Sequence, residues 1–271
     1  MTDACAEIVQ RDDPHLYATA LFAPEPARTR LMVLYAFDCE LSRATRASKE
    51  SLIPRMRLQW WRDAIDEAQS GKPPKGHEVA APLAGLIQDP QFAHAHPLLD
   101  HMIVARELEL GPTQSEHEWK LWASQRFGAL RGAAAVILCP GQKADPPRID
   151  LPMGRAFALR HARAMAASDG MVRFPGIAGT DLAELARGTL TDTVRDIFHG
   201  EAETGIREIT AARQEAFQHR PMVPALMPLL WSERVLRSVQ RDPGVTLGQL
   251  DEIDRPFDGI RLAWRALRGR W

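Results

Sequence analysis

Apolar residues recur at three- and four-residue steps along most of this chain, and this periodicity is the strongest constraint on its fold. In residues 28–47, Leu31, Leu34, Tyr35 and Leu41 follow this spacing, which places them on one face of a helix. No segment shows the convincing alternation of apolar and polar residues that a half-buried strand requires. The sequence therefore predicts an all-α fold.

The same periodicity predicts further helices that are separated by short breaks. Gly71 and the prolines that follow Lys72 end one of these helices. The breaks are too short to be domain linkers, and the chain contains no internal repeat or low-complexity tract. We therefore expect a single domain over residues 1–271. The expected helices are 28–47, 56–69, 82–87, 97–109, 115–138, 153–167, 181–218, 224–240 and 256–270.

The composition indicates a compact protein without a strong electrostatic preference. Hydrophobic residues make up 45% of the 271 positions and the formal net charge is -1, which does not favour a nucleic-acid partner. No apolar run approaches the roughly 20 residues of a membrane span, and the polar start of the chain does not resemble a signal peptide. The three distant cysteines are typical of reduced thiols. We expect a cytoplasmic protein that can also lie peripherally at the inner face of the membrane.

Two segments carry a resemblance to a known family. The run Leu34-Tyr35-Ala36-Phe37, with Glu40-Leu41 after it, and the later L-Q-W-W-R-D at 58–63 resemble the squalene/phytoene synthase family. The spelling F-x-x-E-L-x-R followed by R-L-Q-W-W-R-D is most similar to the divergent branch that contains the mitochondrial complex I assembly factor and its bacterial relatives. The resemblance extends over about 13–217 by motif order. It implies an isoprenoid-synthase-like helical bundle with a central cavity.

The resemblance also shows what this chain lacks. Active members have a D-D-x-x-D motif after the phenylalanine, whose carboxylates hold Mg²⁺ against a prenyl diphosphate. Counted from Phe37, this chain has Ser42, Arg43 and Arg46 at those positions. Mg²⁺ needs oxygen ligands, and a guanidinium group supplies only fixed positive charge. The substitution predicts that head-to-head prenyl transfer is lost and that no Mg²⁺ cofactor is required.

The second aspartate-rich motif of the family is degraded in the same way. It begins recognisably at Gly154 and ends recognisably at Arg173, which is followed by an aromatic residue and a proline. Between them, His161 stands where the family has asparagine and Met165 where it has the first aspartate. Asp169 alone falls on an acidic position, and one carboxylate cannot bind the Mg²⁺ cluster of the family.

Several residues are nevertheless candidates for a cavity or ligand site. Arg43 and Arg46 are three residues apart, so they share a helix face and can clamp an anionic lipid headgroup. The alternative is that both arginines lie on a solvated face and pair with Glu40, Glu50 or another acid. The resemblance places the helix with Trp60 and Trp61 beside the prenyl cavity, and the alternative is that this pair serves core packing alone. The candidates are Phe37, Glu40, Ser42, Arg43, Arg46, Trp60, Trp61, Arg62, His161, Met165 and Arg173.

Three aspartates are weaker candidates for a residual metal site. Asp63 and Asp66 lie three apart on the expected helix 56–69, and Asp169 comes from the second motif. The alternative is that the first two pair with Arg57, Arg62 or solvent.

The end of the chain predicts a basic amphipathic helix at about 256–270. Its apolar and basic residues recur as two separate stripes, which suits an anionic membrane surface or a membrane-protein partner. The alternative is a terminal helix that closes the domain's own core. The residues are Phe257, Ile260, Trp264, Leu267 and Trp271 in the apolar stripe, and Arg261, Arg265 and Arg268 in the basic stripe.

Three functions follow from these observations. The first is a non-catalytic family member that helps to assemble a membrane complex, with respiratory complex I subunits as partners. The second is an active Mg²⁺-dependent transferase that joins two prenyl diphosphates, as phytoene and squalene synthases do. The third is a protein that binds a prenyl or phospholipid ligand. The missing acids favour the first and third functions over the second.

Overall fold

The chain folds into helices of very different length. The structure is a computed structural model that describes residues 2–46, 52–142, 147–214, 220–248, 263–265, 268 and 271, and these contain no β-strand. The predicted all-α class is confirmed. The helices are α1 (Thr2–Asp12), α2 (Pro14–Ala20), α3 (Ala27–Arg46), α4 (Leu52–Gln69), α5 (Ala80–Ile87), α6 (His96–Leu108), α7 (Glu116–Ala123), α8 (Ala129–Leu138), α9 (Asp150–Asp169), α10 (Gly179–Arg187), α11 (Asp192–Gln214), α12 (Val223–Leu226) and α13 (Leu229–Arg241).

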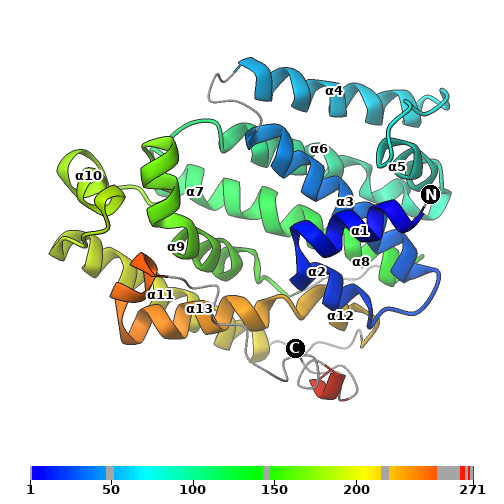
Figure 1. Ribbon diagram of the computed structural model, residues 1–271. Coiled ribbons are helices and arrows are strands. Elements are labelled where there is room, and N and C mark those ends of the chain that lie inside the picture. The colour runs from blue at the N-terminus through cyan, green and yellow to red at the C-terminus, as the bar shows by residue number, and fades with distance from the viewer. Residues whose placement is uncertain are drawn as a thin grey trace.

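The helices surround two large hydrophobic clusters and a small third one. In Figure 1, α4 lies along the upper edge, α11 and α13 lie along the lower edge, and α3, α6 to α9 lie between them. The first cluster is built mainly from α1, α3 to α6 and α8, and the second from α7, α9, α11 and α13. A π-helical turn, Ser124–Gly128, joins α7 to α8 and packs against both α6 and α9. This turn therefore stands where the two halves of the core meet.

A glycine explains the close approach of α9 to α7. A Cβ atom added at Gly154 would lie 2.8 Å from the Cβ atom of Ala123, which is fixed to the backbone and cannot swing away. The pair of small residues thus sets the distance between the two helices. The glycine that opens the second family motif has a packing role here.

Most expected helices are present, and their differences have local causes. The expected helix 181–218 is two helices, because Gly188 adopts a left-handed backbone with φ of 88° and ends α10. Thr191 directly precedes α11, and its hydroxyl caps the helix by accepting a hydrogen bond from the Val194 amide. The expected helix 224–240 is divided into α12 and α13 before Leu229. Periodicity also missed α1 and α2. The expected helix 256–270 lies mostly outside the described residues.

Candidate functional site

A carboxylate is buried at the centre of α3. Asp38 follows Phe37 directly, and its neighbours Tyr35, Phe37 and Leu41 are all buried in the first hydrophobic cluster. Only 5% of Asp38 is exposed. A charge in such a place is costly unless it is paired and hydrogen-bonded.

Two buried arginines supply that pairing. Arg106, near the end of α6, donates from Nη2 to Asp38 Oδ1 at 3.0 Å. Arg126 donates from Nη1 to both carboxylate oxygens of Asp38, at 2.7 and 2.9 Å. Burial by itself would raise the pKa of Asp38, but the charges of Arg126 and Arg106 and their hydrogen bonds outweigh it and hold the pKa below its ordinary value.

A second carboxylate completes the group. Glu109 Oε2 accepts a hydrogen bond from Arg106 Nη1 at 3.0 Å, and its Oε1 accepts one from Trp122 Nε1 at 3.1 Å. Arg126 Nε lies 3.4 Å from the same Oε1. Burial favours a raised pKa for Glu109, but the two arginines and the indole N–H lower it. We call Asp38, Arg106, Glu109 and Arg126 the buried ion-pair cluster. Its two carboxylates and two guanidinium groups balance in charge.

The π-helical turn places Arg126 in this cluster. Inserting a wider turn between α7 and α8 shifts the register of the side chains relative to a continuous α-helix, and such turns are frequent at functional sites. Arg126 is thereby buried beneath the rings of Phe127 and Phe157, at 5.4 and 5.8 Å from their centroids. The Arg126 guanidinium consequently faces α3 rather than solvent.

The three residues at the first motif positions have separate environments. Ser42 touches the buried ion-pair cluster, because its hydroxyl accepts a hydrogen bond from Arg106 Nη2. Arg43 pairs with Glu40 and places Nη2 2.6 Å from Asp12 Oδ2. Arg46 is exposed, and its Nε donates to the Ser42 carbonyl at 3.1 Å. The predicted alternative of pairing with Glu40 is confirmed for Arg43, whose charge two carboxylates neutralise.

The two adjacent tryptophans, Trp60 and Trp61, differ in how deeply they are buried. Trp61 is buried and meets Phe37 edge-on with centroids 5.3 Å apart, so it packs in the core. Trp60 is partly buried, lies 4.9 Å from Trp61 and carries Lys75 over its ring. His77 closes the group against both indoles. Core packing accounts for Trp61, and Trp60 lies at the edge of this aromatic group.

Arg62 and the candidate metal ligands do not converge. Arg62 crosses from α4 to α6, where it binds Asp100 at 2.8 Å and Glu107 at 3.0 Å. Asp63 accepts a hydrogen bond from Gln59, while Asp66 and Asp169 are exposed on α4 and α9. Within the described part of the chain, no group of three or more His, Cys, Asp or Glu residues is arranged to hold a metal ion.

The second motif contributes a buried arginine that binds backbone. Arg173 is only 1% exposed, and it donates to the carbonyls of Leu108 and Glu109 at 3.0 and 2.9 Å. It thus satisfies carbonyls at the end of α6 and supports the segment that holds Glu109. Burial lowers the pKa of Arg173. His161 and Met165 are half-buried on α9, with the His161 ring 4.5 Å from Phe157.

The structure describes only some of the residues of the predicted amphipathic helix near the end of the chain. Phe257, Ile260, Arg261 and Leu267 lie outside the described residues. Trp264 is 57% exposed beneath Arg268, and Arg265 is half-buried. Trp271 is buried in the second hydrophobic cluster under Arg213, which for this residue agrees with the alternative of core closure. The membrane or partner helix stays a prediction. None of the described helices is both long enough and apolar enough to span a membrane.

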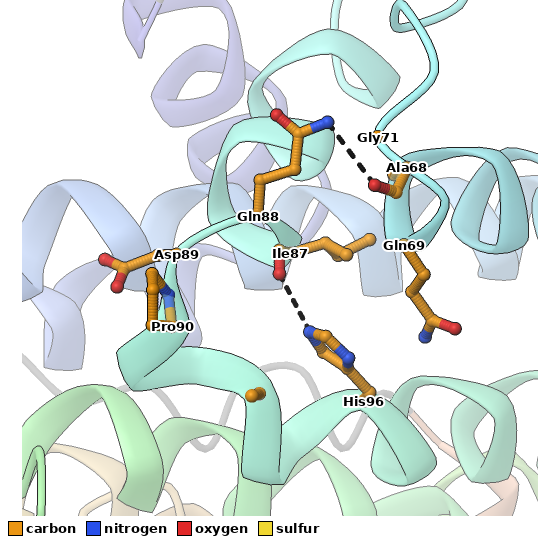
Figure 2. Close-up of a pocket in the computed structure, with 9 residues that line it drawn as sticks. Ala68, Gln69, Gly71, Ile87, Gln88, Asp89, Pro90 and His96 are labelled. Carbon is orange, nitrogen blue, oxygen red and sulfur yellow. Dashed lines mark hydrogen bonds between the residues drawn. The ribbon is translucent and has the colours of Figure 1, made fainter.

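A surface pocket lies away from these residues. It is formed where the end of α4 meets α5 and the start of α6, and has a volume of about 280 Å³ (Figure 2). Gln88 bridges to the Ala68 carbonyl at 3.3 Å, and His96 Nε2 donates to the Ile87 carbonyl at 2.8 Å. The lining contains none of the predicted ligand residues. A central cavity that presents Arg43 and the tryptophan pair stays a prediction.

Sequence reasoning missed the buried ion-pair cluster. The sequence does contain one indication of it, because charged residues stand within apolar stretches of the helices. Asp38 lies among the buried residues of α3, and Arg106 follows Met102 and Ile103 in α6. These residues are distant in the sequence, since 68 positions separate Asp38 from Arg106 and 88 separate it from Arg126. They come together only in the folded chain. Motif comparison directed attention to Arg43 instead.

The acids in the cluster do not fit Mg²⁺. A Mg²⁺ site of the kind that the family resemblance implies needs carboxylate oxygens that are available to the metal. Here the oxygens of Asp38 and Glu109 accept hydrogen bonds from Arg106, Arg126 and Trp122. Two guanidinium charges at the same place also oppose a divalent cation.

Comparison with known proteins agrees with this architecture. The crystal structure of squalene synthase HpnC from Alicyclobacillus acidocaldarius superposes with a TM-score of 0.64 over 89% of this chain and 94% of that one, at 13% identity. The chain is 31% identical over 70 residues to NADH dehydrogenase (ubiquinone) complex I, assembly factor 6 from Bos taurus, and 29% identical over 70 residues to the human protein. These matches cover 26% of this chain and 21% of each relative.

The sequence model described as squalene/phytoene synthase matches residues 9–174, which is more than half of the chain. That span includes α3, α4, α6 and nearly all of the residues that form the candidate site. The chain belongs to the squalene/phytoene synthase family.

Proposed function

We propose that this chain is a family member without head-to-head prenyl transferase activity and that it acts in the assembly of respiratory complex I. The loss of transferase activity is inferred from the buried ion-pair cluster, in which Arg106 and Arg126 form ion pairs with Asp38 and Glu109.

The chemistry of the family reaction explains why this arrangement counts against catalysis. Diphosphate departure requires positive charge that neutralises the leaving group as its charge develops. Mg²⁺ bound by aspartates supplies that charge in active members, according to the family resemblance. Here the two arginines already neutralise two buried carboxylates. Releasing either arginine to a substrate would leave the two carboxylates to share one guanidinium group, and breaking a buried ion pair costs about 3–5 kcal/mol.

The second part of the proposal is supported by the 70-residue similarity to complex I assembly factor 6. The similar proteins carry complex I assembly in their names. The match covers about a quarter of this chain and 21% of each relative.

The loss of catalysis is tested by incubating the purified chain with farnesyl diphosphate and Mg²⁺ and measuring released diphosphate. A prenyl transferase that is known to release diphosphate from farnesyl diphosphate, assayed in parallel, is the positive control. We expect no release above the protein-free rate. Release that depends on both Mg²⁺ and the folded chain would overturn this part of the proposal and favour the active transferase.

The assembly role is tested by deleting the gene in its source organism and measuring assembled complex I on native gels together with NADH:ubiquinone oxidoreductase activity. We expect both to fall and to recover when the wild-type chain is restored. As a control, another respiratory complex should keep its level. Unchanged complex I in the deletion strain would contradict the assembly role, whatever the result of the diphosphate assay.

A further inference from the structure

The first turns of α4 expose apolar side chains that do not belong to the core. Leu52 is 66% exposed, Ile53 40% and Met56 64%. The large hydrophobic residues that are exposed elsewhere in the described chain, Leu21, Leu121 and Trp264, are scattered singly. Helix α4 lies at the upper edge of the molecule in Figure 1. We call Leu52, Ile53 and Met56 the α4 apolar patch.

Helix geometry places this patch opposite the core. At about 100° per residue, the three side chains fall within an arc of about 100°. The buried residues Pro54, Leu58 and Trp61 occupy the other side of the same helix. The patch is therefore a second apolar face and not the rim of the first, so core packing does not explain it.

Two arginines flank the patch. The same geometry places Arg55 on one side of the arc and Arg57 on the other. Both are exposed, and neither forms an ion pair with a residue in the described parts of the chain. The first acidic residue of α4 is Asp63, about two turns beyond Met56. The exposed start of the helix thus combines apolar side chains with two arginines that form no ion pair within the described ranges.

We propose that the start of α4 docks on an anionic lipid bilayer. Leu52, Ile53 and Met56 enter the boundary between headgroups and acyl chains, and Arg55 and Arg57 bind lipid phosphates on both sides of them. Apolar insertion and attraction to anionic lipid act together in this mode of binding. The two arginines favour a bilayer over a protein partner, because binding to an apolar groove of a protein would require only the apolar side chains. The proposal does not depend on a role in complex I assembly.

The test is flotation of the purified full-length chain with phosphatidylcholine vesicles, with or without about one third phosphatidylglycerol. We expect the wild-type chain to float with the anionic vesicles and to remain behind with the neutral ones. Binding should weaken as salt is raised. Leu52→Ser with Ile53→Ser and Met56→Ser should lower binding more than tenfold. Arg55→Gln with Arg57→Gln should lower it roughly fivefold for each arginine.

Matched controls separate the patch from general surface properties. Arg195→Gln with Arg207→Gln removes the same net charge from exposed positions on α11, and Leu21→Ser with Leu121→Ser removes exposed apolar side chains elsewhere. Both controls should bind like the wild type. All variants should keep the wild-type melting temperature, because every changed side chain is exposed.

Two results would overturn the proposal. One is a folded wild-type chain that fails to float with anionic vesicles, which would assign the patch to a protein partner instead. The other is equal binding by the patch variants and their controls, which would place the lipid contact elsewhere on the surface.

Discussion

Arg126 holds both carboxylate oxygens of Asp38, at 2.7 and 2.9 Å, across 88 residues of sequence and between two buried side chains. This pair connects α3 with the π-helical turn after α7. A buried ion pair contributes little more stability than an apolar pair of similar size would. Removing one partner is costly, however, because it leaves the other charge buried without compensation.

Replacing Arg126 with methionine should therefore destabilise the chain strongly. Arg126→Met leaves the Asp38 carboxylate with only part of its compensation, and we expect the free energy of unfolding to fall by about 3–5 kcal/mol. Urea unfolding followed by circular dichroism measures the change. Arg207→Met, at a position whose side chain is 69% exposed, is the control and should change stability by less than about 0.5 kcal/mol. Equal effects of the two substitutions would show that the cluster does not stabilise the fold.

The lowered pKa values of Asp38 and Glu109 predict a loss of stability in acid. Carboxyls of the unfolded chain titrate near about 4, and these two titrate lower in the folded chain. Between these values the unfolded chain binds protons that the folded chain does not, so the free energy of unfolding falls as pH falls. Their contribution is complete above the ordinary carboxyl pKa.

Asp38→Asn tests this contribution. The raised pKa of the half-buried Glu201 acts in the opposite direction, but Asp38 is not among its causes, so it affects both proteins alike. The measurement is the free energy of unfolding from about pH 6 to about pH 3. We expect the variant to be less stable at neutral pH and to show a flatter slope in acid. Parallel curves for the variant and the wild type would contradict the lowered pKa of Asp38.

Gly154 should tolerate no side chain despite its helical position. Alanine is favoured over glycine in a helix by about 1 kcal/mol, but the new methyl group would lie 2.8 Å from the Ala123 Cβ atom. We expect Gly154→Ala to destabilise by about 1–3 kcal/mol. Gly200→Ala in α11 is the control, because a Cβ atom there meets nothing within 4 Å, and it should stabilise the chain by up to about 1 kcal/mol. Thermal melts measure both. A stabilising Gly154→Ala would mean that α9 and α7 can separate.

The two tryptophans near the end of the chain should differ in their effect on stability. Trp271 is buried beneath Arg213, while Trp264 is 57% exposed. Trp271→Ala should lower the free energy of unfolding by about 2–3 kcal/mol, and Trp264→Ala should change it little. Chemical denaturation of the two variants measures the difference. The reverse order would favour the prediction that the terminal tryptophan serves a membrane or partner surface.

Local physical signals predicted the fold better than the site. Helical periodicity identified α3, α4, α6, α9 and α13 because each buries one face. It merged α10 with α11, since the pattern runs through Gly188 and only the left-handed backbone there ends the helix. It also missed α1 and α2.

The site depended on long-range contacts that no local pattern records. Motif comparison identified Arg43 and Arg46 as substitutions, and the alternative of a solvated face agrees with the exposure of Arg46, but nothing in the sequence showed that Asp12 would bind Arg43. The charged residue that matters most, Asp38, follows Phe37 within the same motif. Its partners come from α6 and from a π-helical turn, whose register shift periodicity does not predict.

The most direct test of the central claim is calorimetric titration of the purified chain with farnesyl diphosphate in the presence and absence of Mg²⁺. The claim is that the arginines of the buried ion-pair cluster, and not metal-binding aspartates, occupy the centre of this family fold. It predicts no Mg²⁺-dependent binding heat. Saturable binding that appears only with Mg²⁺ would contradict the account, because it would require carboxylates that bind the metal.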